Sequence, residues 1–359
     1  MMEAAIRLSR QNSGRTASNP SVATLIVRDS ASGPMIVGRG VTAIGGRPHA
    51  ETVALAEAGK ATRGATAYVT LEPCAHHGRT PPCANALVAA GVARVVAAAT
   101  DPDERVSGKG YAILREAGIE VEPGVLAEEA ARAMAGYMTQ RVKNRPHVTL
   151  KLAVSSDGMI GRAGQGQVAI TGATARAQVH LLRARSHAIL VGTATVLADD
   201  PELTCRLPGL ENRSPIRIVL DRELRMPVGS KLVRTARQVP LWLATTRELD
   251  DAARRPLEEA GAEFVAAVAA DGSVALPELL EDMAARGIQS LMVEGGATVA
   301  QSFLAEGLVD RIALYTGPAA VGPDGIAAPF SRETMPAGFT RTRFMAYGDD
   351  LYEEFEREG

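Results

Sequence analysis

The sequence predicts a soluble α/β protein with two domains, on the basis of its length, its composition and its alternating pattern. With 359 residues the chain is longer than one hydrophobic core usually serves, so two cores are expected. A hydrophobic share of 46% and a charged share of 22% are typical of a folded soluble protein and argue against disorder. Strand-like and helix-like segments alternate through both halves of the chain.

The first half predicts a layered α/β sandwich. Two apolar runs at 23–29 and 34–42, separated by the turn residues 30–33, indicate a β-hairpin after an opening helix. Helical and extended patterns then alternate: helices are expected at 49–59, 82–91 and 108–118, and strands at 65–73, 93–100 and 119–124. A last helix from about 127 to 140 completes this half.

A domain boundary is expected at Asn144–Pro146, because Pro146 disfavours helix in its predecessor and a new strand pattern begins there. We therefore predict one domain at 1–144 and a second at 146–359. The second half repeats the alternation with different content: strands are expected at 186–192, 216–221, 240–245, 262–268 and 290–296, and helices at 174–185, 250–261, 276–287 and 297–307.

Charge and cysteine content limit the function classes. A formal net charge of -2 argues against a generally basic nucleic-acid surface and favours a small anionic metabolite. A framework of disulfides needs an even and larger number of cysteines than the three present, Cys74, Cys83 and Cys205. The N-terminus lacks an apolar signal region, and no apolar run is long enough to span a membrane. We therefore expect a cytoplasmic protein with no nucleic-acid and no membrane partner.

His49, Cys74 and Cys83 make a candidate zinc site. Zinc prefers such thiolate and imidazole ligands, and a set of three leaves the fourth position open for water, as in catalytic sites. Cys74 is expected at a helix start, where the N-terminal partial charge favours a thiolate. Glu51 is placed to move protons rather than to bind metal, and H-x-E with P-C-x-x-C is a deaminase signature. The alternative is two unrelated buried cysteines and a helix-capping glutamate.

The segment between the two cysteines departs from that signature, because AHHGRTPP stands where two residues are usual. His76 and His77 could act as further ligands. Since the three-ligand set is already complete, we expect these histidines and Arg79 to line the substrate entrance or to shape the loop.

In the second half, Gly295–Gly296 stands between a strand and a helix. The free N–H groups of such a turn can hold a phosphate, although the turn could equally serve close packing alone. No G-x-G-x-x-G follows a strand, so the usual dinucleotide fingerprint is absent and another cofactor fold is expected.

Motifs along the whole chain resemble one family. LEPCAHHGRTPPC, HAE and DPDERVSGKG, followed by KLAVSSDGMIG, PIRIVLD and VEGGATVAQSFL, are similar to the bifunctional riboflavin biosynthesis deaminase/reductase. The resemblance implies a cytidine-deaminase-like three-layer sandwich followed by a dihydrofolate-reductase-like domain. It also implies zinc-dependent deamination of 2,5-diamino-6-(5-phosphoribosylamino)pyrimidin-4-one, and then NADPH-dependent reduction of the ribosyl group of 5-amino-6-(5-phosphoribosylamino)uracil to a ribityl chain.

The resemblance also implies residue roles. In the deaminase, zinc is expected on His49, Cys74 and Cys83, proton transfer at Glu51 and a base contact at Asn19. In the reductase, NADPH is expected to contact residues on strands, turns and one helix: Ala153, Ala169, Thr195, Asp199, Gly296, Ala297 and Thr298. The substrate is expected to contact Gln167, Arg183, Leu203, Arg206 and Glu294, with the two arginines on its phosphate.

Several positions leave alternatives open. Asp199 could cap the following turn together with Asp200, and each arginine alone could be a solvated surface charge. Gln167 and Ala169 replace the serine and tryptophan of the S-x-W-I-T segment that many members carry, and Asp103 replaces the asparagine of DPNP. Contacts through the missing side chains are therefore not expected.

Two other function classes fit less well. A nucleic-acid deaminase should show a basic track or aromatic stacking residues, and aromatic residues make up only 4% of the chain. A zinc-stabilised binding module would need a fourth protein ligand and would have no use for Glu51. We therefore expect a metabolic enzyme that acts on a small molecule, assembled as a homo-oligomer.

Overall fold

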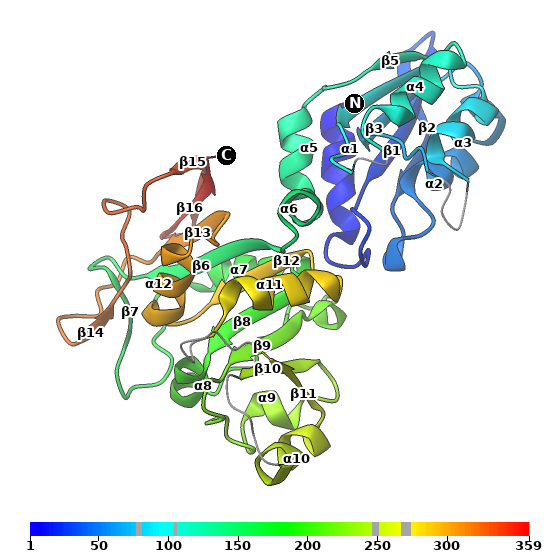
Figure 1. Ribbon diagram of the computed structural model, residues 1–359. Helices are drawn as coiled ribbons and strands as arrows, with labels where there is room; N and C mark the ends of the chain where they lie inside the picture. Colours follow the sequence, from blue (N-terminus) through cyan, green and yellow to red (C-terminus); the bar gives the residue numbers. More distant parts are fainter. Residues whose placement is uncertain (77–80, 104–105, 246–250, 267–273, 359) are drawn as a thin grey trace. The chain divides into compact units, whose positions relative to one another are not determined.

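The computed structural model describes residues 1–76, 81–103, 106–245, 251–266 and 274–358. The chain divides into two compact units, Met1–Asn144 and Arg145–Gly359 (Figure 1). Each unit has its own sheet and its own buried core. No helix among the described residues is both long and apolar enough to cross a membrane.

The N-terminal unit is built on a five-stranded sheet in the order β2-β1-β3-β4-β5. Its strands are β1 (Ala23–Ser30), β2 (Gly33–Val41), β3 (Thr66–Leu71), β4 (Arg94–Ala99) and β5 (Glu120–Glu122). β1 pairs antiparallel with β2 and β3, whereas β3 with β4 and β4 with β5 are parallel. The expected hairpin is confirmed, because the β1–β2 register pairs Ser30 with Gly33 and Ala23 with Val41.

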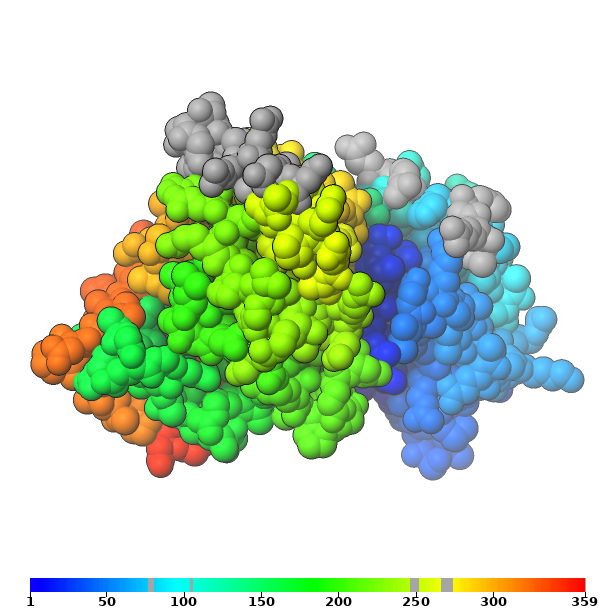
Figure 2. All heavy atoms as spheres, turned by 90° about the horizontal axis from the view of Figure 1, so that it is seen from below, coloured from blue at the N-terminus to red at the C-terminus, as the bar shows by residue number. Residues whose placement is uncertain are grey.

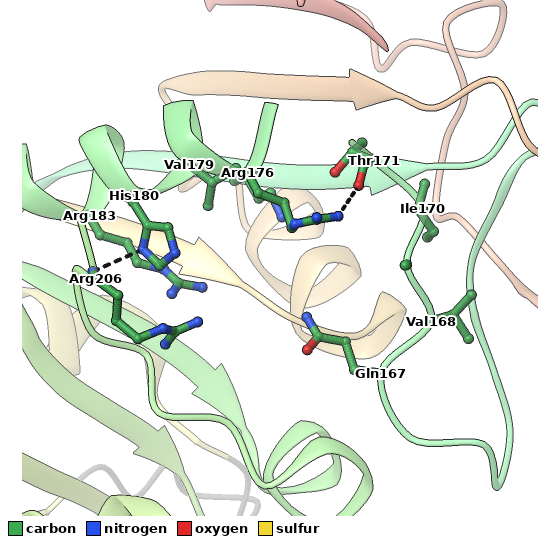
Figure 3. A pocket seen from close by; sticks show the side chains of 11 residues that line it. Gln167, Val168, Ile170, Thr171, Arg176, Val179, His180, Arg183 and Arg206 are labelled. Atoms are coloured by element: carbon green, nitrogen blue, oxygen red, sulfur yellow. Dashed lines mark hydrogen bonds between the residues drawn. The ribbon is translucent and has the colours of Figure 1, made fainter. Parts of the chain in front are cut away.

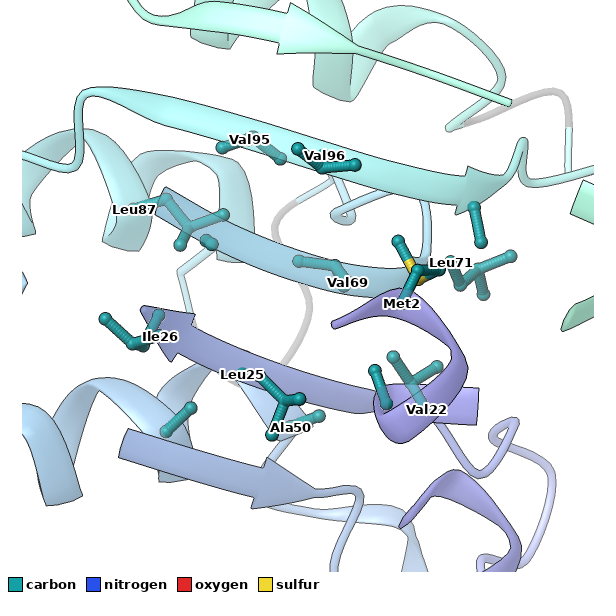
Figure 4. Packing of buried hydrophobic residues seen from close by; sticks show 14 of the residues in the cluster. Met2, Val22, Leu25, Ile26, Ala50, Val69, Leu71, Leu87, Val95 and Val96 are labelled. Atoms are coloured by element: carbon teal, nitrogen blue, oxygen red, sulfur yellow. The ribbon is translucent and has the colours of Figure 1, made fainter. Parts of the chain in front are cut away.

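Helices on both faces of this sheet complete three layers (Figure 1). They are α1 (Met2–Ser9) and α5 (Ala127–Ala133) in one group, and α2 (Ala50–Ala58), α3 (Cys83–Ala90) and α4 (Lys109–Glu116) in the other; α6 (Ala135–Lys143) follows α5. The single helix expected at 127–140 is two helices, interrupted at Met134. Figure 4 shows why the layers hold together: Met2 of α1, Ala50 of α2 and Leu87 of α3 pack with the apolar side chains of the central strands.

The C-terminal unit is built on a nine-stranded sheet in the order β11-β10-β9-β8-β12-β6-β13-β16-β15. Its strands are β6 (His147–Val154), β8 (Ala188–Gly192), β9 (Ile216–Leu220), β10 (Leu241–Thr245), β11 (Ala262–Ala266), β12 (Ser290–Glu294), β13 (Arg311–Thr316), β15 (Phe339–Tyr347) and β16 (Asp350–Arg357). The seven strands from β11 to β13 are mutually parallel, and β16 and β15 continue the sheet antiparallel. The short, apolar, β-branched segments of the sequence form these buried parallel strands.

Crossover helices connect the parallel strands, as parallel sheets require. They are α7 (Ala173–Arg185), α8 (Thr193–Asp199), α9 (Lys231–Arg234), α10 (Asp251–Ala260), α11 (Leu276–Ala285) and α12 (Ala297–Ala305). A separate two-stranded sheet pairs β7 (Met159–Arg162) with β14 (Gly325–Ala327). Figure 2 shows this pairing in space, with orange atoms of the β14 region beside green atoms of the β7 region.

Arg145 belongs to the C-terminal unit, although the domain ranges expected from the sequence left it out of both domains. Its guanidinium donates two hydrogen bonds to Asp310, at 2.6 and 2.8 Å, and the N–H of Val148 donates a third to the same carboxylate at 2.9 Å. Both side chains of the ion pair are buried. Asp310 thereby fixes the start of the unit beside the beginning of β13.

Candidate active sites

Three candidate metal ligands converge in the N-terminal unit. His49 is the residue before α2, Cys74 lies in the loop after β3, and Cys83 is the first residue of α3. The Nδ1 atom of His49 lies 3.7 Å from the Sγ atom of Cys74 and 3.3 Å from that of Cys83. Tetrahedral zinc places such nitrogen and sulfur ligands about 3.6 Å apart, so the three side chains fit zinc. Among the described residues this is the one His/Cys/Asp/Glu group that could hold a metal.

Cys74 does not begin a helix, so that expectation was wrong. α3 begins at Cys83, because the two prolines at 81–82 hold the preceding chain extended and provide no N–H for a helical turn. The helix terminus still acts on Cys74, since the N–H of Cys83 donates to its Sγ at 3.2 Å. Hydrogen bonds from the Cys83 thiol, from His49 and from this N–H lower the pKa of the Cys74 thiol to about 4. Cys74 is therefore a thiolate, the form that binds metal.

Glu51 lies in the first turn of α2, two residues after His49, and is only 4% exposed. Burial, and then the negative charge of Cys74, raise the pKa of its carboxyl to about 7. A carboxyl with such a pKa both accepts and releases protons near neutral pH, which is what a general acid/base needs.

A cavity opens onto these groups. Asn19, Arg47 and His76 line it beside His49 and Glu51. Further lining residues, Asp101, Asp103, Tyr137 and Arg141, come from the end of β4 and from α6. His76 thus lies at the cavity and outside the metal-ligand group, as the sequence suggested. His77 and Arg79 lie outside the described residues.

Glu72 anchors the segment that borders this cavity. Its buried carboxylate accepts hydrogen bonds from the N–H groups of Asp101, Gly108 and Gly110, at 3.4, 3.1 and 3.0 Å. Gly110 approaches so closely that a Cβ atom there would lie 2.0 Å from the carbonyl oxygen of Pro73. The backbone at Asp101, Gly108 and Gly110 is therefore fixed to the residues that directly precede Cys74.

A second pocket lies in the C-terminal unit, between α7 and the segment 167–171 (Figure 3). Its lining includes Gln167, Ala169, Arg183 and Arg206, four residues expected from the sequence. Figure 3 shows the side chains of His180, Arg183 and Arg206 gathered on one side, with Gln167 projecting toward them from the other. The pocket brings together positive charge and hydrogen-bonding groups, which suits a phosphorylated ligand.

Beside the pocket, the positive charges of Arg183 and Lys151 face the negative charge of Glu294. Arg183 donates to Glu294 at 2.7 Å, and the Nζ atom of Lys151 lies 3.9 Å from the other carboxylate oxygen. Burial raises the pKa of the Glu294 carboxyl. The positive charges of Arg183 and Lys151 lower this pKa by more, because they stabilise the carboxylate, so the pKa lies below its ordinary value. Burial also lowers the pKa of Lys151. This side of the pocket is therefore a compact ion cluster on β6, β12 and α7.

The segment from Asp200 to Arg206 carries the rest of the expected substrate contacts. The side chain of Leu203 is 3% exposed and packs in the core with β8 and β9, so it faces away from the pocket. The guanidinium of Arg206 is half exposed and reaches Glu202 at 3.2 Å. Of these two residues, only Arg206 presents its side chain to a ligand.

Five of the seven expected cofactor residues follow β8 or β12, which are neighbouring strands; Ala153 lies on β6, the strand next to β12, and Ala169 lies in the segment 167–171. α8 begins directly after β8, and Gly296 precedes α12 directly after β12. The N–H of Gly296 donates to Thr195 at 3.3 Å, and Gly295, at φ 135°, would bring a Cβ atom 3.0 Å from the same hydroxyl. Two helix N-termini therefore meet at one sheet edge, an arrangement that binds dinucleotide phosphates.

The two aspartates at the end of α8, Asp199 and Asp200, have different surroundings. Asp200 accepts a hydrogen bond from the N–H of Lys231 at 2.8 Å, so it caps the start of α9. Asp199, in the last turn of α8, forms no side-chain hydrogen bond or ion pair within the described part of the chain, and burial raises the pKa of its carboxyl. Asp199 is therefore the one available to a ligand.

Sequence reasoning missed Lys151, Arg176 and His180, all of which line the second pocket. A signal existed for two of them. Lys151 interrupts an apolar strand on the same face as Ala153, and His180 lies one helical turn before Arg183.

The fold and the two sites define a bifunctional enzyme with a zinc-dependent deaminase unit and an NADPH-dependent reductase unit. The family described as RibD C-terminal domain matches residues 146–352, and the cytidine and deoxycytidylate deaminase zinc-binding region matches residues 1–99. The chain therefore belongs to the RibD family, the bifunctional deaminase/reductases of riboflavin biosynthesis.

Individual relatives agree over nearly the whole chain. Riboflavin biosynthesis protein RibD of Escherichia coli is 41% identical, covering 90% of this chain and 88% of that protein. The Aquifex aeolicus protein is 40% identical over 89% and 87%. Among solved structures, Acinetobacter baumannii RibD superposes with a TM-score of 0.85 at 35% identity, covering 100% of this chain and 98% of that one. A Thermotoga maritima deaminase/reductase gives 0.84 at 32% identity over 99% and 97%.

Proposed function

We propose that the N-terminal unit hydrolyses the amino group of 2,5-diamino-6-(5-phosphoribosylamino)pyrimidin-4-one and that the C-terminal unit reduces the ribosyl group of 5-amino-6-(5-phosphoribosylamino)uracil. The Thermotoga maritima relative is named as diaminohydroxyphosphoribosylaminopyrimidine deaminase and 5-amino-6-(5-phosphoribosylamino)uracil reductase. Both sites of this chain offer what these substrates need, a hydrolytic centre for the first and a positively charged pocket for the second.

The observation that carries the deaminase proposal is the convergence of His49, Cys74 and Cys83 on one point beside buried Glu51. These three side chains would hold zinc. When bound, zinc lowers the pKa of a water molecule so that hydroxide forms near neutral pH. Glu51 would take the proton from that water and pass it to the ring nitrogen and then to the leaving ammonia. Asn19, at the cavity wall, would orient the pyrimidine.

Metal analysis of purified variants tests this assignment. Native protein should hold about one zinc per chain. His49→Ala and Cys83→Ala should lose most of it, because two ligands do not retain a catalytic zinc. Cys205→Ala is the matched control: it removes a buried cysteine far from the group in sequence and outside it in space, and it should leave the zinc content unchanged. Undiminished zinc in His49→Ala would refute the site.

For the reductase we propose that the protein positions the substrate while NADPH supplies the hydride. Ala153, Ala169, Thr195, Asp199 and the start of α12 at Gly296, Ala297 and Thr298 would contact the cofactor. Glu294 and Arg183 would contact the substrate, because the Oε1 atom of Glu294 is buried without a hydrogen bond and can accept one from a bound molecule. Lys151 would lie beside the same bound group.

The phosphate of this substrate would bind chiefly to Arg206. Arg183 already donates to Glu294 and, at 3.1 Å, to the carbonyl oxygen of Thr204, so one N–H of each terminal nitrogen is used within the protein. Arg206 is held by a partly exposed pair with Glu202 and by a 3.4 Å hydrogen bond to the hydroxyl of Thr204; such exposed contacts contribute little and can be exchanged for a phosphate. Gln167 would add a neutral hydrogen bond from the opposite wall.

We also propose that the chain forms a homo-oligomer through β15 and that it works in the cytoplasm. β15 is an edge strand, and it exposes Phe344 and Met345. Exposed edge strands with apolar side chains tend to pair with another strand. All three cysteines are unpaired thiols, which suits a reducing compartment. Light scattering that gave the 37.6 kDa mass of one chain would contradict the oligomer.

A further inference from the structure

His180 lies on the pocket side of α7, one turn before Arg183 (Figure 3). Its Nδ1 atom is 3.2 Å from the carbonyl oxygen of Thr204 and 3.4 Å from the backbone nitrogen of Arg206. These contacts attach one edge of the ring to the segment that carries Arg206. The Nε2 atom is on the other edge, and it forms no hydrogen bond with the described residues.

The charges around His180 favour its neutral form in the free protein. Burial, Arg183 and Arg206 lower the pKa of the imidazole below its ordinary value, and the more distant Glu294 acts in the opposite direction. The other charged groups of the pocket are Lys151 on β6, Arg176 on α7 and Glu202 in the segment beside the ring. A phosphate monoester carries close to two negative charges at neutral pH, so its arrival would reverse this balance.

This inference rests on the proposed function of the pocket as the substrate's phosphate site. We propose that His180 is a third phosphate-binding residue, whose Nε2–H donates to a phosphate oxygen, and that the ring takes up a proton from solvent when the phosphate binds. In the cation both ring nitrogens donate, Nδ1 to Thr204 and Nε2 to the phosphate, and Nδ1 no longer accepts from the N–H of Arg206. The protonated ring supplies the charge that Arg183, committed to Glu294, does not provide.

Two substitutions separate this contact from a merely structural role. His180→Asn places an amide nitrogen where Nδ1 lies, so it keeps the link to Thr204 but removes the pocket-facing nitrogen and the charge. His180→Gln places its amide nearer to the position of Nε2 and restores a neutral donor, without the link. We expect His180→Asn to raise the reductase KM about tenfold with kcat nearly unchanged, and His180→Gln to raise it less. If the ring only fixed the 204–206 segment, the order would be reversed.

The pH profile of KM provides the readout that a structural role would not change. The ring is protonated in the complex and neutral in the free enzyme, so between the two pKa values binding weakens as pH rises. The native KM should therefore increase by up to tenfold per pH unit within the range of about pH 6.5 to 8, where the phosphate itself is mostly dianionic. Both variants should lose this slope. The assay uses the full chain, NADPH and the deaminated intermediate.

The dephosphorylated intermediate distinguishes failure of this inference from failure of the proposed function. It should have a high, pH-independent KM that is the same in native enzyme and both variants. A native enzyme that prefers the phosphorylated intermediate while His180→Asn retains its KM and its pH slope would overturn the role of His180 alone. A native enzyme that does not distinguish the two substrates would overturn the phosphate pocket, and His180 with it.

Discussion

The two sites of this chain use their titratable groups in opposite ways. In the deaminase cavity the burial of Glu51 and the negative charge of Cys74 outweigh the opposing charge of His49, and the pKa of Glu51 is raised to about 7. In the reductase pocket the buried carboxylate Glu294 has Arg183 at 2.7 Å and Lys151 at 3.9 Å, and its pKa is lowered. The first carboxyl can exchange a proton near neutral pH, whereas the second keeps its charge.

This difference shows what each unit contributes to its reaction. Hydrolytic deamination needs a proton to be moved from water to the leaving group, and the buried Glu51, with its raised pKa, suits that step. In the reduction the cofactor provides the reacting hydride, so fixed charges that hold the substrate in place suffice. Each of the following measurements would break or sharpen this contrast.

The largest effect is expected from Glu51→Gln. The amide retains the shape of the side chain but cannot carry the proton, so deaminase kcat should fall by roughly 10²- to 10⁴-fold. Zinc content and reductase activity, measured on the same preparation, should stay at native levels. Deamination at more than a tenth of the native rate would show that another group moves the proton.

A large loss of stability is expected from Arg145→Met, because it leaves the buried carboxylate of Asp310 without its cation. Breaking such a pair costs about 3 kcal/mol of unfolding free energy. Trp242, the one tryptophan of the chain, lies buried in the C-terminal unit and reports the transition by fluorescence. Arg254→Met removes an exposed pair with Glu258 and should cost less than about 1 kcal/mol. Equal losses in the two variants would contradict the prediction.

The ion pair between Arg145 and Asp310 also predicts that the stability of the protein depends on pH. Burial raises the pKa of the Asp310 carboxyl, but hydrogen bonds from Arg145 lower this pKa by more, so it lies below its ordinary value. A depressed folded pKa means that the carboxylate stabilises the fold fully above about pH 4 and progressively less as pH falls through the folded value. The stability difference between native protein and Asp310→Asn should therefore shrink below about pH 4. A difference that stayed constant to pH 3 would rule this out.

A tenfold to hundredfold rise in the reductase KM is expected from Arg206→Ala, since it removes charge-assisted hydrogen bonds worth about 1.5–3 kcal/mol. Deaminase kcat and KM should not change. Arg254→Ala provides a matched control, because its pair with Glu258 is exposed to a similar extent as that of Arg206 with Glu202. If Arg206→Ala weakened NADPH binding and still preferred the phosphorylated over the dephosphorylated substrate, Arg206 would be assigned to the cofactor site.

The smallest effect is expected from Gln167→Ala. It removes one neutral hydrogen bond from the pocket wall, which should raise the reductase KM by about fivefold. An increase as large as that of Arg206→Ala would mean that the amide, and not the charge, dominates phosphate recognition.

The deaminase site could be predicted from sequence because its ligands are rare residue types in short motifs. His49 and Glu51 stand in one motif, and Cys74 and Cys83 in another. The helix expected at 82–91 is confirmed as α3, whereas the expectation that Cys74 also begins a helix was wrong, because Cys74 lies in the loop before the inserted segment. Only the coordinates show that Glu72 holds the backbone at Asp101, Gly108 and Gly110.

The reductase pocket was less accessible to sequence reasoning, because Lys, Arg and Glu are common surface residues. Arg183 and Glu294 are 111 positions apart, and no local pattern connects them. Lys151 could only be suspected from its place within an apolar strand. The strands β13 to β16 were not identified, in part because β15 exposes most of its residues on both faces and lacks the alternation that indicates a half-buried strand.

The backbone hydrogen bonds that Glu72 accepts from Asp101, Gly108 and Gly110 bear on which side chains near the cavity can change. The three donors to Glu72 are backbone N–H groups, so they are present whatever side chains the segment carries. Only Gly110 is constrained by space, since it lies against Pro73. Asp103 lines the cavity and pairs with Arg141 at 3.8 Å, and its side chain takes no part in the hydrogen bonds to Glu72. A changed side chain at position 103 would therefore alter the cavity wall and leave in place the backbone hydrogen bonds next to the residues that precede Cys74.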